Sequence, residues 1–251
     1  MMTEPQLVTT VAGGVGRLRL NRPDKRNAIT TELGGLISEA MVAFDEDDDV
    51  VVIVIEGTDG SFCAGADMAQ ANEENLKGNR RFDPSARAAQ RIAASTKPIV
   101  AAVDGPAYGA GALIACTADI RIASDRARFR FPGSEYGLVV GAAALPKIVG
   151  APAAKELIFT GRAVGAEEAL RLGLVNRVVP LADFTAAVDE VANAIAAASP
   201  LALRWAKQTI DASVSGGDAR GMEQQADQLL RGGADHVARF AKATQKIVGR
   251  S

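Results

Sequence analysis

Two short segments of small residues could bring backbone amides close to a ligand oxygen. Residues 62–68 read Phe-Cys-Ala-Gly-Ala-Asp-Met, and residues 105–111 read Gly-Pro-Ala-Tyr-Gly-Ala-Gly. Each follows an apolar run, at 50–55 and at 99–103, that is typical of a strand buried on both faces. Small residues let N–H groups approach a ligand, and a helix N-terminus adds about half a positive charge. The two turns are therefore candidates for an oxyanion hole, with tight packing against a sheet as the alternative.

Side chains that commonly move protons or bind metals are scarce. His236 is the single histidine, so neither a Ser-His-Asp triad nor a histidine-based metal centre is expected. Cys63 and Cys116 make neither a disulfide scaffold nor a zinc site. The acidic run 45–49 lacks the spaced ligands and central glycine of a calcium loop. Chemistry in this chain is expected to rely on carboxylates, backbone dipoles or tyrosine, without a metal.

The elements that position these turns alternate between strands and helices. Alternating apolar residues predict a hairpin over 6–20, and helical spacing predicts a helix over 31–44 that Thr30 or Thr31 caps. An uneven, polar helical segment is expected over 70–90. Further strands are predicted at 50–55, 99–103, 120–123, 128–131 and 174–178, and further helices at 84–95, 112–118, 151–159 and 166–172. This order predicts an α/β fold, followed by a helical extension over 200–248.

Composition excludes several classes of protein. Of the 251 residues, 48% are apolar and 23% charged, which supports a packed core. The net charge of −2 argues against a nucleic-acid partner. No apolar run approaches the length of a membrane span. We expect a soluble cytoplasmic protein without nucleic-acid or membrane partners.

Several further motifs occur between residues 15 and 210. They are Asn21-Arg22-Pro23, Asn27-Ala28, the two small-residue turns, Ala118-Asp119-Ile120-Arg121-Ile122-Ala123-Ser124, Thr160-Gly161-Arg162, Gly173-Leu174-Val175-Asn176 and Ser199-Pro200-Leu201-Ala202. In this order and spacing they resemble the crotonase (enoyl-CoA hydratase/isomerase) superfamily. The resemblance implies an α/β, crotonase-like spiral of β-β-α turns over 1–198 and a C-terminal helical region over 199–251 for trimerisation or for covering the site.

The resemblance also implies a ligand and an assembly. The ligand would be an acyl-CoA thioester, and no separate cofactor is expected because coenzyme A is part of the substrate. A homotrimer or a hexamer is the implied assembly. By similarity, the N–H groups of Ala66 and Ala110 would hold the thioester carbonyl oxygen, although the family usually has glycine where Ala110 stands.

Further residues take expected roles from the same resemblance. Lys25 and Arg26 lie where the family meets the phosphates of the adenine nucleotide, with a solvated surface as the alternative. Asp67 is expected to brace the turn that carries Ala66. The other positions implied to contact substrate are Ala28, Ala64, Gly65, Met68, Tyr108, Gly109, Leu113 and Gly133.

The chain departs from the family where hydratases place two glutamates. Leu113 and Gly133 stand at these positions. A positioned acid or base contributes about a hundred- to ten-thousandfold in rate, so enoyl-CoA hydration is expected to be absent or very slow. Glu135 is the candidate replacement base, with pairing at the surface as the alternative. Leu113 and Gly133 also predict a roomier, more apolar acyl end of the site.

Three functions stay open at this point. The first is a crotonase-type isomerase, hydrolase or lyase that stabilises a thioester enolate. The second is a non-catalytic acyl-CoA carrier or sensor, and the third is a structural subunit with an unused pocket. Among the remaining side chains, we expect Cys63 and Cys116 to be buried, Tyr136 to pack, and His236 to lie at the surface or at a subunit contact.

Overall fold

The computed structural model describes residues 4–79 and 83–248. Contacts divide the chain into two compact units, Met1–Ala196 and Ala197–Ser251. Residues 80–82, which belong to the helical segment expected over 70–90, lie outside the described residues. The assignment of 1–198 to a spiral core and of 199–251 to a trimerisation or lid region stays a prediction.

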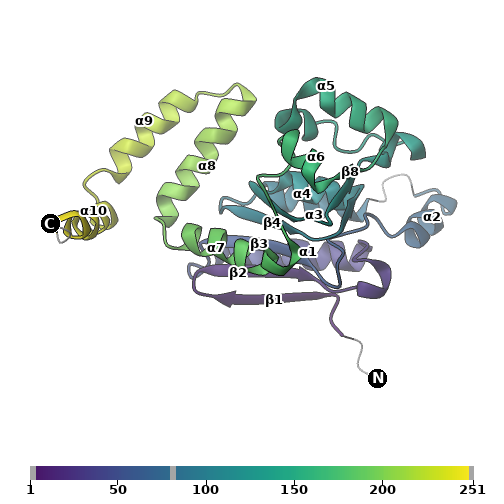
Figure 1. The fold of residues 1–251 in the computed structure, drawn as a ribbon, viewed down its shortest axis with the longest axis horizontal. Helices are drawn as coiled ribbons and strands as arrows, with labels where there is room; N and C mark the ends of the chain where they lie inside the picture. The colour runs from purple at the N-terminus through teal and green to yellow at the C-terminus, as the bar shows by residue number, and fades with distance from the viewer. Residues whose placement is uncertain (1–3, 80–82, 249–251) are drawn as a thin grey trace. The chain divides into compact units, whose positions relative to one another are not determined.

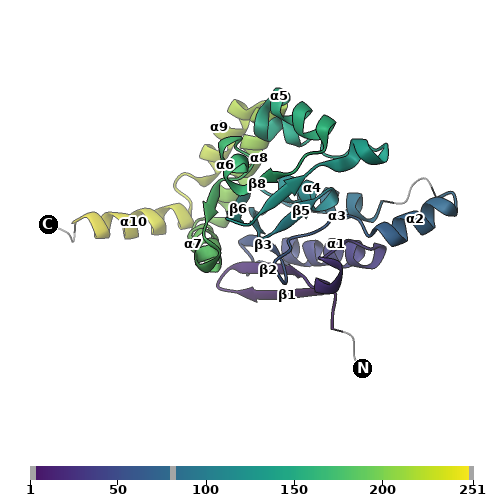
Figure 2. The ribbon, with the colours of Figure 1, turned by 45° about the vertical axis from the view of Figure 1, so that its right-hand side comes forward.

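A six-stranded sheet in the order β1-β2-β3-β4-β6-β9 organises the first unit (Figure 1). Its strands are β1 (Leu7–Ala12), β2 (Val15–Leu20), β3 (Val52–Gly57), β4 (Ile99–Val103), β6 (Ile120–Ser124) and β9 (Arg177–Val179). The first two form the predicted antiparallel hairpin, and the other neighbours pair in parallel. Figure 2 shows β1 at the edge of this sheet. Every residue of β4 is buried, as expected for a strand covered on both faces.

A second, smaller sheet has three strands. It consists of β5 (Pro106–Tyr108), β7 (Arg128–Arg130) and β8 (Val164–Gly165). In the parallel β5·β7 pair, Tyr108 stands opposite Arg130. Two isolated bridges, Cys63 to Ala107 and Ile29 to Ala66, tie the loops after β2 and β3 to this layer. The small sheet therefore brings segments from distant parts of the chain to one place.

Helices cover both faces of the large sheet. The described helices of this unit are α1 (Thr31–Glu46), α2 (Met68–Leu76), α3 (Pro84–Ala93), α4 (Ala110–Thr117), α5 (Leu145–Thr160), α6 (Ala166–Arg171) and α7 (Phe184–Ala196), with short 3₁₀ turns η1 (Pro23–Lys25), η2 (Pro132–Tyr136) and η3 (Leu181–Asp183). Thr30 caps α1 by accepting from the Leu33 N–H, as predicted. One face of the sheet packs against α1, α3 and α4, and the other against α7. The α/β fold class is confirmed.

Several element boundaries differ from the predicted ones. The helix expected at 112–118 begins two residues earlier, because Ala110 and Gly111 give no amphipathic signal although they form its first turn. The helix expected at 151–159 begins at Leu145 and is interrupted at Gly150, whose φ of 76° breaks the helical path just before Pro152. The last strand lies at Arg177–Val179, because the apolar Leu174 and Val175 are buried in the preceding turn.

The described residues of the second unit form three helices, α8 (Pro200–Ser215), α9 (Ala219–Leu230) and α10 (Ala234–Val248). Among its described residues, Ala226 is the one buried hydrophobic residue. Within the described part of the chain, no single helix is long and apolar enough to cross a membrane, whereas the bent pair Leu181–Ala196 and Pro200–Ser215 passes that test of length and composition together.

Arg121 on β6 caps the end of α4. Its side chain is buried, with the residue only 6% exposed. The guanidinium donates to the Leu174 carbonyl at 2.7 Å and to the Ala118 and Ala115 carbonyls at 2.5 and 3.3 Å. Burial lowers the pKa of Arg121. A cation at a helix C-terminus complements the helix dipole, so Arg121 fixes the helix whose other end carries Ala110.

Replacing this cap is expected to destabilise the fold. Arg121→Met leaves three carbonyls without their donor, so the free energy of unfolding should fall by about 1–3 kcal/mol in urea denaturation. Arg128→Met, at an exposed position on β7, is the control and should stay within about 0.5 kcal/mol of the parent protein. An Arg121→Met protein as stable as the parent would refute the capping role.

Candidate active site

The first corner, between β3 and α2, leaves one backbone amide unused. Four of the five successive N–H groups from 63 to 67 donate to atoms of the protein: Cys63 to Pro106 O (3.0 Å), Ala64 to Arg26 O (2.9 Å), Gly65 to Cys63 Sγ (3.5 Å) and Asp67 to Ile29 O (2.9 Å). The Ala66 N–H makes no hydrogen bond to any described residue. Four of these amides thus have acceptors within the protein, and the remaining one is available to donate to a ligand oxygen.

The second corner, between β5 and α4, also presents a free amide. Gly109 precedes the helix with φ 51° and ψ −113°, and its N–H donates to Arg130 O at 2.9 Å. The next amide, that of Ala110, is the first of the helix and has no acceptor among the described residues. First-turn amides lack an intrahelical partner and carry the positive end of the helix dipole. Ala110 therefore offers a second donor.

The two corners touch each other. Cys63 and Ala107 form a bridge, and the Tyr108 N–H donates to Cys63 O at 2.9 Å. Gly65 fits this contact because it has no side chain: a Cβ there would lie 2.8 Å from Tyr108 O and 3.5 Å from the Ala110 nitrogen. Its φ of 104° also lies in a region that favours glycine. The structure thus brings Ala66 and Ala110 onto adjoining segments, which approach each other closely at Gly65.

A methyl group at this position is expected to push the two corners apart. In Gly65→Ala the Cβ would lie 2.8 Å from Tyr108 O, so the backbone must shift, and affinity for an acyl-CoA should fall by about a hundredfold or more in titration calorimetry.

Gly13→Ala is the matched control, because Gly13 also has a positive φ but a Cβ there meets no atom within 4 Å. The control should lose some stability and keep its affinity. Equal affinities of Gly65→Ala and the parent protein would show that binding does not need the close approach of the two corners.

Asp67 connects the first corner to two other segments. Its carboxylate accepts from the Gln70 N–H at 3.3 Å, which caps α2, and from Arg22 Nη2 at 3.2 Å. Burial of this group raises its pKa, but the hydrogen bonds from Gln70 and Arg22 outweigh burial and hold the pKa of Asp67 below its usual value. Asp67 is thus ionised in the folded protein, and its contacts are those of a brace.

The lowered pKa of Asp67 predicts a pH-dependent stability. Its contribution is complete above the unfolded pKa, about 3.9, and is lost as the pH falls through the lower folded pKa. Asp67→Asn keeps a capping oxygen and removes the charge. The variant should be about 1–2 kcal/mol less stable than the parent at pH 7, and the difference should shrink below about pH 4. Urea denaturation at both pH values measures this, and a constant difference would refute it.

The loop expected to meet the coenzyme lies against the first corner. Lys25 and Arg26 are exposed, and Ala28 is buried. Arg26 and Asn27 both have positive φ, 49° and 58°, which is uncommon for residues with side chains. Arg26 O accepts from Ala64, so this backbone shape fits the corner. Two further candidates in the first corner are Ala64, which is half-buried, and Met68, which is exposed.

The two positions that replace glutamates differ in their surroundings. Leu113 is partly buried on α4 and packs against the main core. Gly133 is buried in η2, and a Cβ there would lie 2.9 Å from Leu138 O and 3.1 Å from the Val140 nitrogen. The expectation of a roomier acyl end is therefore wrong at Gly133, because the backbone of residues 138–140 occupies the space of a side chain.

Glu135 is held by an arginine. Both of its carboxylate oxygens accept from Arg130 Nη2, at 2.6 and 2.7 Å, and Arg130 Nε donates to Gly161 O at 2.7 Å. This geometry is the surface pairing that the sequence analysis left open as the alternative to a base. Tyr136 beside it is mostly exposed, so the expected packing role is not seen in this chain. Tyr108 is partly buried on β5.

Neither cysteine is an activated nucleophile. Cys63 and Cys116 are both buried, as predicted, and burial raises the pKa of each thiol to about 12. His236 is exposed on α10, where its Nδ1 accepts from the Gly232 N–H at 3.0 Å. Among the described residues, no group of three or more His, Cys, Asp or Glu side chains could hold a metal ion.

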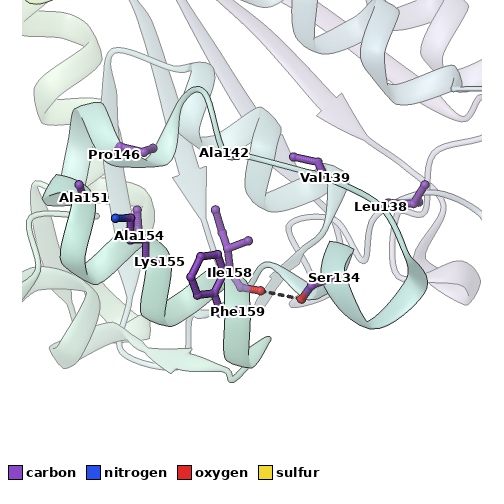
Figure 3. A pocket seen from close by; sticks show the side chains of 10 residues that line it. All are labelled: Ser134, Leu138, Val139, Ala142, Pro146, Ala151, Ala154, Lys155, Ile158 and Phe159. Carbon is purple, nitrogen blue, oxygen red and sulfur yellow. Dashed lines mark hydrogen bonds between the residues drawn. The ribbon is translucent and has the colours of Figure 1, made fainter.

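A separate cavity lies between the loop after η2 and α5, as Figure 3 shows. It has a volume of about 380 Å³ and is lined mainly by apolar side chains, among them Leu138, Val139 and Phe159. Ser134 Oγ donates to Ile158 O at 2.7 Å across one end. Leu138 and Val139 come from the same loop that covers Gly133.

This arrangement defines an α/β protein with adjoining strand-to-helix corners, and comparisons with known proteins identify the family of this fold. The Enoyl-CoA hydratase/isomerase family model matches residues 10–244. The "Short-chain-enoyl-CoA hydratase" of Clostridium acetobutylicum is 35% identical over 223 residues, which are 87% of this chain and 82% of that protein. The "Mevalonyl-coenzyme A hydratase sidH" of Aspergillus fumigatus is 38% identical over 74% of this chain and 71% of its own length.

Solved structures agree with these sequence relatives. A crystal structure of enoyl-CoA hydratase from Bacillus anthracis matches with a TM-score of 0.91 and 27% identity, covering 96% of this chain and 97% of that one. A Geobacillus kaustophilus enoyl-CoA hydratase subunit matches with a TM-score of 0.88 and 31% identity, covering 96% of each. The chain belongs to the enoyl-CoA hydratase/isomerase (crotonase) superfamily, which binds acyl-CoA substrates. The predicted family and crotonase fold are confirmed.

Proposed function

We propose that this protein binds an acyl-CoA thioester and stabilises its enolate with the amides of Ala66 and Ala110. The observation that carries the proposal is that these two N–H groups lack partners among the described residues and lie on corners that pack closely at Gly65. Such donors stabilise the charge that develops on a carbonyl oxygen, at about a hundred- to a thousandfold in rate for each donor.

The coenzyme would lie along the loop that precedes α1. Lys25 and Arg26 are exposed on this loop, and the backbone of the loop is hydrogen-bonded to the first corner. In this proposal their side chains bind the phosphates of the coenzyme while the thioester binds at Ala66. Ala28, Ala64, Met68, Tyr108 and Gly109 are the remaining substrate contacts of this proposal. No resident cofactor is needed, because coenzyme A belongs to the substrate.

The reaction is not enoyl-CoA hydration in this proposal, although relatives carry hydratase names. Leu113 supplies no carboxylate, and Gly133 has no space for one. Glu135 is engaged with Arg130, so we propose that it orders η2 and that a solvent water, and not Glu135, takes the α-proton when the enolate forms. An isomerase, lyase or hydrolase that uses the enolate fits the site best.

A substrate assay tests the catalytic part of the proposal. With crotonyl-CoA, hydration should be about a hundred- to ten-thousandfold slower than in a site with positioned carboxylates. With butyryl-CoA in deuterium oxide, mass spectrometry should detect deuterium at the α-carbon, because the α-proton passes to the solvent as the enolate forms and a deuteron from the solvent then returns to that carbon.

The controls distinguish the alternatives. Gly65→Ala should abolish exchange, since its methyl group forces apart the two segments that carry the amides. Rapid hydration of crotonyl-CoA would refute the assignment. Tight binding of butyryl-CoA without exchange would favour an acyl-CoA carrier or sensor, which the paired state of Glu135 also permits.

The C-terminal helices are part of the proposal as an assembly surface. Val237, Phe240 and Ile247 share one face of α10 and are exposed, Phe240 by 68%. Burying such a side chain contributes about 1.5–3 kcal/mol, which favours a partner for this face. We propose that it is a second copy of the chain in a homotrimer or hexamer in the cytoplasm.

Sedimentation tests this assembly. Phe240→Glu should shift the protein toward a monomer in analytical ultracentrifugation, because a charge replaces an aromatic side chain that the proposed assembly would bury. Lys242→Glu, on the same helix, is the control and should keep the parent assembly. A parent protein that sediments as a monomer would refute the proposed oligomer.

A further inference from the structure

We propose that Arg22 is a positioning residue that holds the Ala66 amide in place for the thioester oxygen. This inference rests on the function proposed above and adds a residue to it. The Arg22 guanidinium donates with Nη2 to Asp67 Oδ2 at 3.2 Å and with Nη1 to the Ala28 carbonyl. Both charged side chains of the ion pair are largely buried, with 15% and 16% exposed. The guanidinium thus joins two backbone segments far apart in the sequence.

The two segments that Arg22 joins enclose the free amide. The Ile29 N–H donates to Gly65 O at 2.8 Å, and the Asp67 N–H donates to Ile29 O at 2.9 Å. Ile29 therefore binds the residue before Ala66 and the residue after it. Arg22 binds Ala28 on one segment and Asp67 on the other, directly beside this bridge. A shift of either segment would turn the Ala66 N–H.

Arg22 is itself fixed by a buried asparagine. Its N–H donates to Asn27 Oδ1 at 2.8 Å, and the Asn27 N–H returns a bond to Arg22 O at 2.9 Å. Asn27 is fully buried, and its Nδ2 donates to Ser61 O at 2.7 Å and Thr58 O at 3.1 Å. Because the backbone of Arg22 is fixed, its guanidinium can hold Ala28 and Asp67 in place. The planar group reaches these two acceptors in a fixed geometry.

The same loop links the two ends of the proposed ligand. Lys25 and Arg26, the proposed phosphate contacts, lie three and four residues after Arg22, within the turn that Asn27 closes. Coenzyme binding on this turn and carbonyl binding at Ala66 therefore depend on one set of contacts. Loss of Arg22 should affect the carbonyl end more than the affinity for the coenzyme, since neither Lys25 nor Arg26 is removed.

The test compares the parent protein with Arg22→Met, Arg22→Lys and Asp67→Asn. The probe is butyryl-CoA labelled with ¹³C at the carbonyl carbon, and isotope-edited infrared spectroscopy reports how strongly the bound carbonyl is polarised. In the parent protein the carbonyl band should shift to lower frequency on binding, and Arg22→Met should lose most of this shift. Its α-proton exchange rate should fall by about a hundredfold, as for a small misplacement of a catalytic group, while affinity for coenzyme A itself is retained.

The conservative variant and a surface variant sharpen this test. Arg22→Lys keeps the positive charge opposite Asp67 but removes the planar group that donates to two acceptors at once. Its carbonyl shift should therefore lie between those of the parent and Arg22→Met. Arg19→Met removes an arginine from β2 that pairs with Glu56 at the surface, and it should leave shift and exchange unchanged. Asp67→Asn should reproduce the loss in Arg22→Met, and the double variant should lose no more than either.

Each outcome bears on one proposal. A folded Arg22→Met protein with the full parent carbonyl shift overturns the positioning role. If Arg22→Met does not fold, Asp67→Asn provides the same test, and an undiminished shift in that variant overturns the role equally. A parent protein whose bound carbonyl shows no shift overturns the proposed function itself, which separates the two failures.

Discussion

The site depends on a backbone amide that is left unpaired while its neighbours are satisfied. Around Ala66, the N–H groups of residues 63–65 and 67 all have acceptors within the chain. Because a buried polar group without a partner is costly, a fold usually retains one only where a ligand or water can meet it. In the corner between β3 and α2, amides that all have acceptors thus surround one free donor, and the first amide of α4, that of Ala110, is a second free donor.

Buried polar side chains keep that frame rigid. Arg121 holds the far end of α4, Asn27 closes the loop before α1, and Asp67 holds the start of α2. Arg121 and Asn27 bond to backbone atoms remote in sequence, and Asp67 pairs with the side chain of Arg22. The apolar sheet behind them supplies stability, whereas these polar contacts determine where the two amides lie. Interior rigidity of this kind allows a site to be prepared before the ligand arrives.

Sequence reasoning was informative where a local pattern has one physical meaning. The β-branched run at 50–55 and the small-residue turns were sufficient to predict buried strands that lead into corners. It was less informative where contacts between residues distant in the sequence determine the local structure. The ion pair between Arg22 and Asp67 spans 45 residues, and no periodicity signals it. The loss of space at Gly133 results from the backbone of residues 138–140, whose path the sequence did not reveal, so the expected roomier pocket was wrong there.

A crystal structure of the protein with a bound, slowly reacting acyl-CoA analogue tests the central claim most directly. The account predicts that the carbonyl oxygen lies about 2.7–3.1 Å from the nitrogen atoms of both Ala66 and Ala110. A carbonyl oxygen bound elsewhere, with either amide facing away from it or covered by a side chain, would contradict the account.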